Sequence, residues 1–185
     1  GMLEINTEVV APEANRQRLA DLNGVVLLKF RSREALQLQL ASTIDPVLKD
    51  SLEHKILLLR NEIVEEVINT VPDLLDAIAY NWHNSFTYDE AYSYILENLL
   101  ESVERYTSTK VPFCKFTSFF WMYNKNLLRN KLKKTHAAKR DQRKTHSLDA
   151  LVSSWSDDTG DIPKYDTFSL DEDILETYAN KLTLR

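Results

Sequence analysis

Five aromatic side chains lie within eight residues of this chain, directly before its most basic segment. The run F-T-S-F-F-W-M-Y-N-K-N-L-L-R-N-K-L-K-K spans residues 116–134, and residues 125–144 hold nine Lys or Arg against one acid. Aromatic rings stack on unpaired bases, while cations follow the phosphates of the same strand. The two together favour contact with single-stranded nucleic acid, and a solvated basic helix face is the alternative.

Helical spacing separates the side chains of this segment into faces. Phe116, Phe120, Tyr123 and Leu127 recur at three and four residues, so we expect Phe116 and Phe120 to be core residues. Phe119, Trp121 and Tyr123 remain open between core packing and base stacking. A second face carries a basic stripe, which consists of Lys125, Arg129, Lys133, His136 and Arg140.

The chain has 185 residues, a length that predicts one domain, or one domain with a small satellite, and its net charge is −5. Only three glycines are present, which argues against phosphate-cradling loops. Cys114 is the only cysteine, so no internal disulfide forms, and a reducing cytoplasm is expected. No apolar run approaches the roughly 18 residues of a membrane span. The histidines form no ligand set with Cys114, so we expect no metal site. The acids of residues 89–104 have no His, Lys or Gly-rich loop nearby that would give them a catalytic role, so we expect no enzymatic activity and no cofactor.

Periodicity predicts an all-α fold. Residues 15–42 form a helix, in one piece or divided at Asn23-Gly24, whose face is Leu19, Leu22, Val26 and Phe30, while Pro12 breaks any helix before them. Further helices are expected over residues 46–70, 73–83, 87–105 and from 116 past 134. Pro72 ends the second because the preceding residue is pushed out of the helical region. Thr87 with Glu90 has the spacing of a capping box.

The acidic segment after residue 145 is expected to be a linker followed by a short amphipathic helix over residues 169–182. This gives three parts: an N-terminal helical segment (2–45), a compact helical domain (46–145), and the acidic linker with its helix (146–185).

The residue order from 89 to 127 resembles region 2 of bacterial sigma factors of the sigma-70 family. That pattern is roughly D-L-x-Q-E-x-x-x-G-L-x-x-A-V-x-x-[FY], a short loop, then [FY]-x-F-S-T-Y-A-x-W-W-I-R-x-x-I. This chain reads D-E-A-Y-S-Y-I-L-E-N-L-L-E-S-V-E-R-Y, then C-K-F-T-S-F-F-W-M-Y-N-K-N-L. Met122 and Tyr123 fall on the tryptophan pair and Lys125 on the arginine, whereas Asn98 replaces the glycine and Ser93 the glutamine.

The resemblance implies a promoter-recognition subunit that binds core RNA polymerase and melts the −10-type promoter element. The first helix would bind the clamp helices of the largest polymerase subunit, and the second would contact the melted non-template strand. With only region 2 visible, the chain looks most like the late-transcription sigma factors of large tailed phages. Their short acidic tail engages a sliding clamp.

Three sets of site residues follow from these expectations. The DNA-binding set is Phe119, Trp121, Met122, Tyr123, Lys125, Arg129, Lys133, Lys134, Arg140 and Arg143. The polymerase-binding set is Asp89, Glu90, Glu97, Asn98 and Glu101, for which an ordinary solvated face is the alternative. The set for a clamp or other accessory factor is Leu170, Ile174, Leu175 and Tyr178. Two other functions stay open: a general DNA- or RNA-binding protein, and a regulator of polymerase such as an anti-sigma factor.

Overall fold

The computed structural model contains five α-helices and no strand in the part of the chain that it describes, residues 2–144. For residues 2–13 and 139–144 it describes the backbone alone. The helices are α1 (Met2–Ala41), α2 (Pro46–Thr70), α3 (Pro72–Asn81), α4 (Tyr88–Arg105) and α5 (Phe116–Lys144). The all-α prediction is therefore confirmed. The predicted helix over residues 169–182, with Leu170, Ile174, Leu175 and Tyr178, lies outside the described residues.

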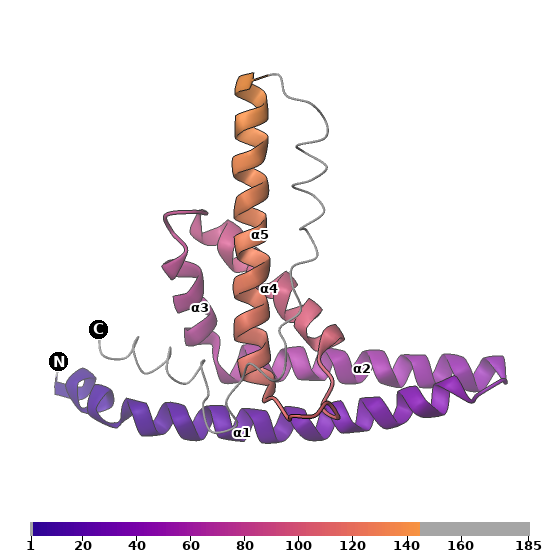
Figure 1. Cartoon of the computed structure of the whole chain (residues 1–185). Coiled ribbons are helices and arrows are strands. Elements are labelled where there is room, and N and C mark those ends of the chain that lie inside the picture. The colour runs from indigo at the N-terminus through magenta and orange to yellow at the C-terminus, as the bar shows by residue number, and fades with distance from the viewer. Residues whose placement is uncertain (1, 145–185) are drawn as a thin grey trace.

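Helices α1 and α2 form a long antiparallel hairpin along one side of the molecule (Figure 1). The side chain of Asp45 begins α2 by accepting hydrogen bonds from the backbone N–H groups of Val47 and Leu48, both at 3.4 Å. These contacts satisfy donors that have no partner inside the first helical turn. Pro46 fits there because its missing N–H is not needed.

The predicted inner face of α1 is confirmed, since Leu19, Leu22, Val26 and Phe30 are all buried. One expectation about α1 is wrong, because the backbone stays helical through Pro12. Of the two alternatives for residues 15–42, the structure has the undivided helix, which continues through Asn23-Gly24. Proline removes one intrahelical hydrogen bond and often bends a helix, but it does not have to end it. Adding a Cβ at Gly24 would meet nothing within 4 Å, so this glycine is not required by packing.

Two sequence signals set the ends of the middle helices. Val71 is non-helical before Pro72, which ends α2 and starts α3 as predicted. Thr87 caps α4, because its hydroxyl oxygen accepts from the backbone N–H of Glu90 at 3.2 Å. The same hydroxyl donates to the Glu90 carboxylate at 2.9 Å, so Thr87 and Glu90 do interact as the spacing predicts.

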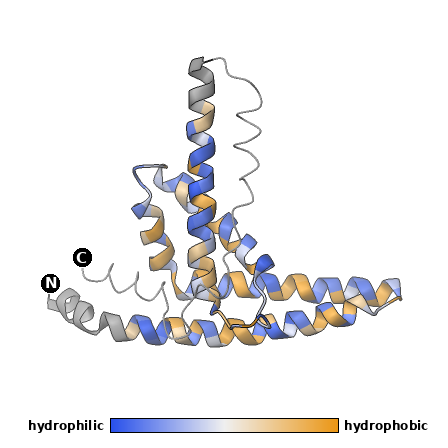
Figure 2. Cartoon of the chain, viewed as in Figure 1, coloured by the Kyte–Doolittle hydropathy of each residue, from blue (hydrophilic) through white to orange (hydrophobic). Residues whose placement is uncertain are grey.

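Helix α5 stands across the hairpin, and its second half extends beyond α3 and α4 (Figure 1). Its first half is rooted in a cluster of rings: Phe30 of α1, Tyr106 after α4, and Phe116 and Phe119 of α5, with centroids 4.6–5.5 Å apart. The extended half is mostly hydrophilic (Figure 2). The residues of α1 share one core with those of α2 to α5, so α1 packs as part of the same unit.

Candidate nucleic-acid interface

One face of α5 carries both rings and cations. Trp121, Lys125, Arg129 and Lys133 follow one another at intervals of four residues, which places them on one side of an α-helix. Met122 lies beside them, one residue after Trp121. Trp121, Met122 and Lys125 are half-buried, whereas Arg129 and Lys133 are exposed. The structure therefore brings five members of the expected DNA-binding set together on one surface, which we call the outer face of α5.

Two rings of the same set are in the core, and assigning them to DNA contact is wrong for this fold. Phe119 is 0% exposed and Tyr123 is 1% exposed. Phe119 packs edge-on against Tyr106 and Tyr123, with centroids 5.5 and 5.7 Å away. Burial, followed by the charge of Glu101, raises the pKa of Tyr123. Bases cannot reach either ring without opening the packing of α5 against its neighbours. Phe116 and Phe120 are buried as expected.

The remaining cations of α5 have different surroundings. Lys131 lies over the ring of Tyr94 with its Nζ 4.6 Å from the centroid, so this lysine joins α5 to α4. Lys134 is half-buried and falls outside the outer face. Arg140 and Arg143 continue the helix, but their side chains are outside the described residues.

Helix α4 presents an acidic face to solvent. Asp89, Glu90, Glu97 and Glu101 of the expected polymerase-binding set are exposed. Asn98 differs from them, because it is half-buried and its Nδ2 donates to the Oδ1 of Asn124 on α5 at 2.9 Å. Asn98 thus helps to hold the two helices together.

A groove of about 580 Å³ runs between α2, α4 and α5 next to this acidic face. Leu100 lies in it and is 40% exposed, which places an apolar side chain among carboxylates. Arg60 on one wall approaches Glu104 at 3.5 Å. Arg105 also lines the groove and approaches Glu101 at 3.6 Å, so the rim carries both charges. An apolar side chain inside a polar, charged rim is consistent with a protein-binding surface.

Charge is strongly segregated along the chain. Between Arg60 and Arg105 there are ten Asp or Glu and no Lys or Arg. This span covers most of the second half of α2, all of α3 and nearly all of α4. Its negative field opposes the approach of phosphates, whereas the outer face of α5 attracts them.

Sequence reasoning missed the residues that fix the start of α5. Asn23 of α1 accepts from the backbone N–H of Thr117 at 3.2 Å and donates from Nδ2 to the Thr117 hydroxyl at 2.9 Å. Asn23 therefore does the work of an N-cap residue from a distant helix. The available signal was the absence of Ser, Thr, Asp or Asn at residue 115, directly before α5.

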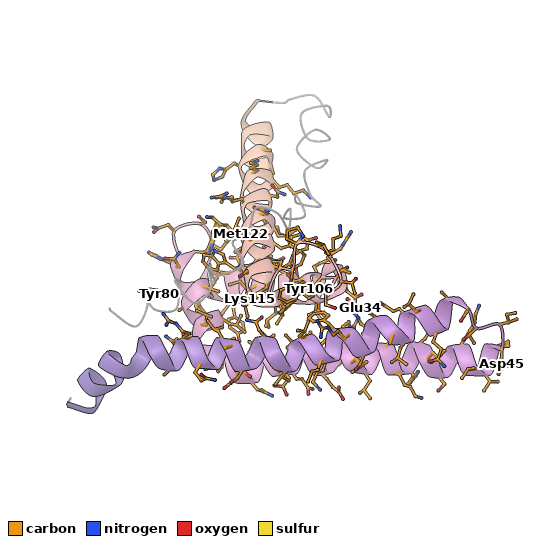
Figure 3. The ribbon with its side chains drawn as sticks, turned by 60° about the horizontal axis from the view of Figure 1, so that its bottom comes forward. Glu34, Asp45, Tyr80, Tyr106, Lys115 and Met122 are labelled. Carbon is orange, nitrogen blue, oxygen red and sulfur yellow. The ribbon has the colours of Figure 1, made fainter. Side chains whose placement is uncertain are left out.

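A second distant contact fixes the loop between α4 and α5. Arg33 of α1 is 3% exposed, and it donates to the backbone oxygen of Tyr106 at 3.3 Å. Desolvation lowers its pKa, and the carboxylates of Glu104 and Glu34 oppose that shift. Glu34 in turn accepts from the backbone N–H and the hydroxyl of Ser108, at 2.7 and 2.5 Å. Figure 3 shows Glu34 and Tyr106 close together where this loop meets α1.

No protein-family model, curated protein or solved structure matches this chain. Among residues 14–138, whose side chains the structure describes, no group of three or more His, Cys, Asp or Glu has an arrangement that could hold a metal ion. In the same part of the chain, none of the helices combines the length and apolar character that a membrane crossing requires.

Proposed function

We propose that this chain is a sigma-type promoter-recognition subunit, which binds core RNA polymerase and opens a −10-type promoter element. In this proposal its promoters are those of phage late genes, and it acts in the cytoplasm of the bacterial host. The observation that carries the proposal is the outer face of α5. It joins Trp121 and Met122 to Lys125, Arg129 and Lys133 on a helix whose opposite side is anchored in the core.

The chemistry of this face suits a strand that is being unpaired. A base that leaves the duplex loses the stacking on its neighbours, and stacking on an aromatic ring replaces it with about 1–3 kcal/mol of binding free energy per base. Lys and Arg at every helical turn hold the phosphates of the same strand. With Phe119 and Tyr123 in the core, the stacking role is assigned to Trp121, with Met122 as its apolar neighbour.

The acidic face of α4 supports a separate contact with polymerase. Leu100 and the neighbouring groove offer an apolar centre, and Glu97 and Glu101 offer a charged rim. A protein partner with complementary charge fits this surface better than nucleic acid does. The accessory-factor contact through Leu170, Ile174, Leu175 and Tyr178 stays a prediction from the sequence.

Transcription in vitro tests the proposal directly. The full chain is added to core RNA polymerase on DNA from the genome of origin, and the 5′ ends of the RNA are mapped. We expect discrete start sites that core polymerase alone does not produce. An absence of such sites would refute promoter recognition and leave a general nucleic-acid-binding protein or a polymerase regulator.

A matched pair of charge reversals tests the polymerase face. Glu97→Lys with Glu101→Lys should weaken retention of core polymerase, because opposite charges at an interface become like charges. Glu53→Lys with Glu65→Lys makes the same change in net charge at exposed positions of α2 and should have little effect. Equal loss in both variants would assign the effect to net charge and not to this face.

A further inference from the structure

Two pairs of stacked rings lie at the adjoining ends of α3 and α4. Tyr80 stacks on His83 with centroids 5.4 Å apart, and Tyr88 stacks on Tyr92 with centroids 5.9 Å apart. The hydroxyl of Tyr88 donates a hydrogen bond to Asp76, which lies one helical turn before Tyr80. That bond ties the two helices together, so the rings form one surface.

We call this the tyrosine–aspartate surface; it consists of Asp76, Tyr80, His83, Tyr88, Asp89 and Tyr92. Its rings are open to solvent, since Tyr80 is 60% exposed and Tyr88 is 39% exposed. Figure 3 shows Tyr80 at the outer side of the molecule, at the opposite end from the loop at Asp45. Exposed aromatic rings gathered at one place are typical of binding surfaces.

The carboxylates of this surface lack the cations that balance others in the same acidic span. Asp73 pairs with Arg18 at 2.9 Å and Glu62 with Lys29 at 3.2 Å, both on α1. No Lys or Arg of the described residues pairs with Asp76 or Asp89, both of which are exposed. The surface therefore has uncompensated negative charge beside electron-rich ring faces.

Negative charge beside exposed rings favours some kinds of ligand over others. Phosphates are repelled by the ten carboxylates between Arg60 and Arg105. A purely apolar partner would desolvate Asp76 and Asp89 without supplying a cation to balance their charge, which is costly. A guanidinium group satisfies both features, because it stacks on an aromatic face and donates two parallel hydrogen bonds to a carboxylate.

We propose that the tyrosine–aspartate surface binds an arginine-bearing segment of a protein partner. The guanidinium stacks on the exposed ring of Tyr80 or Tyr88, and the neighbouring aspartates accept its hydrogen bonds. Lysine is the poorer ligand, because its ammonium group has no planar face to stack and no paired donors. This contact is independent of the function proposed for α5, because it uses other helices and the opposite charge.

Titration of the full chain with a synthetic peptide of alternating Gly and Arg tests the proposal. Backbone amide shifts are followed by NMR, with alternating Gly–Lys and Gly–Glu peptides as controls. We expect saturable shifts concentrated on residues 76–92 with the arginine peptide. The lysine peptide should bind about threefold more weakly, and the glutamate peptide should not bind.

Substitutions distinguish binding at the tyrosine–aspartate surface from a general attraction of the peptide to negative charge. Tyr80→Ala should weaken the arginine peptide by about twofold to fivefold, and Tyr80→Phe should leave it unchanged because the ring is kept. Asp89→Asn should weaken it by about threefold or more through the lost charge-assisted hydrogen bond. Glu65→Gln removes one charge from the same acidic span on α2 and should change binding by less than about 1.5-fold.

Several outcomes would overturn the proposal. The arginine peptide would fail to bind, or its amide shifts would be centred on other helices. Alternatively, Glu65→Gln and Asp89→Asn would weaken the peptide equally, or Tyr80→Ala would bind it with unchanged affinity. Analytical sedimentation of the chain alone tests a further outcome, which is the formation of a dimer. If the surface is covered by a second copy in a salt-sensitive dimer, the occupant is this chain's own basic helix and not another protein.

Discussion

Replacing Asn23 by alanine removes the cap that α1 provides for the first turn of α5. The substitution removes the acceptor to which the backbone N–H of Thr117 donates, and Thr117 is only 2% exposed, so water has little access to replace the amide. The Thr117 hydroxyl also loses its donor from Asn23 Nδ2. The third contact, from Nδ2 to the backbone oxygen of Leu19 at 3.0 Å, matters less because that oxygen is inside a helix.

Two opposing effects set the change in the free energy of unfolding that Asn23→Ala should cause. Losing an N-cap costs about 0.5–2 kcal/mol, and leaving a buried donor unsatisfied costs about 1–3 kcal/mol; both figures describe the same lost bond and are not summed. Alanine is the better helix former within α1 by up to about 0.7 kcal/mol. We therefore expect a net destabilisation of about 1–1.5 kcal/mol.

Urea unfolding followed by circular dichroism measures this difference. With a slope of about 1–3 kcal/mol per molar urea, the midpoint should fall by roughly 0.3–1.5 M at constant slope. Asn61→Ala, at an exposed position inside α2, makes the same chemical change without a cap and should be neutral or slightly stabilising. Asn23→Asp keeps the acceptor and should retain most of the stability. If Asn23→Ala unfolds at the same midpoint as Asn61→Ala, the contact with Thr117 does not hold α5.

Three further predictions concern the outer face of α5 and the tyrosine–aspartate surface. Trp121→Ala should impair promoter opening more than initial binding, and a template already mismatched over the start region should restore its activity; failure of that rescue with normal helix content would remove Trp121 from melting. Arg129→Ala with Lys133→Ala should weaken binding to duplex and mismatched templates alike and lower the salt dependence by about one unit of slope per lost phosphate contact, whereas an unchanged slope would mean that these side chains do not touch phosphate. The hydrogen bond to Asp76 raises the pKa of the Tyr88 phenol from 10.0 to about 12, so the contribution of this contact to stability is complete below pH 10 and is lost as the pH rises through about 12. Asp76→Asn should therefore move one tyrosine of the phenolate absorbance titration to lower pH, and an unaltered titration would contradict the contact.

Local signals were sufficient to predict most helix ends. Asp45-Pro46, Val71-Pro72 and Thr87 each act within a few residues, through caps or through the steric demand of proline. The predicted helix over residues 46–70 matches α2 at both ends for this reason. The inner face of α1 was also predictable, because Leu19, Leu22, Val26 and Phe30 have the spacing of a single stripe.

The orientation of α5 was not predictable in the same way. Aromatic residues occupy so much of its first two turns that spacing alone does not tell core rings from surface rings. What decides the matter is Tyr106, which lies beneath α5 and receives the ring of Phe119. The cap from Asn23 joins residues 94 positions apart and leaves no local pattern.

Because α5 is packed against the rest of the molecule mainly in its first half, a small rotation there moves the far end of the helix by a larger distance. Leu128 is the last residue of α5 in the shared core, while the backbone of the helix continues to Lys144. At 1.5 Å per residue, residues 129–144 extend the helix by about 24 Å, so a rotation of about 8° near Leu128 displaces its far end by roughly 3 Å. That distance is about one step between neighbouring nucleotides of a strand. The precision with which the packing around Leu128 and the contact of Lys131 with Tyr94 hold α5 therefore sets the register with which the basic half of α5 can meet a nucleic acid.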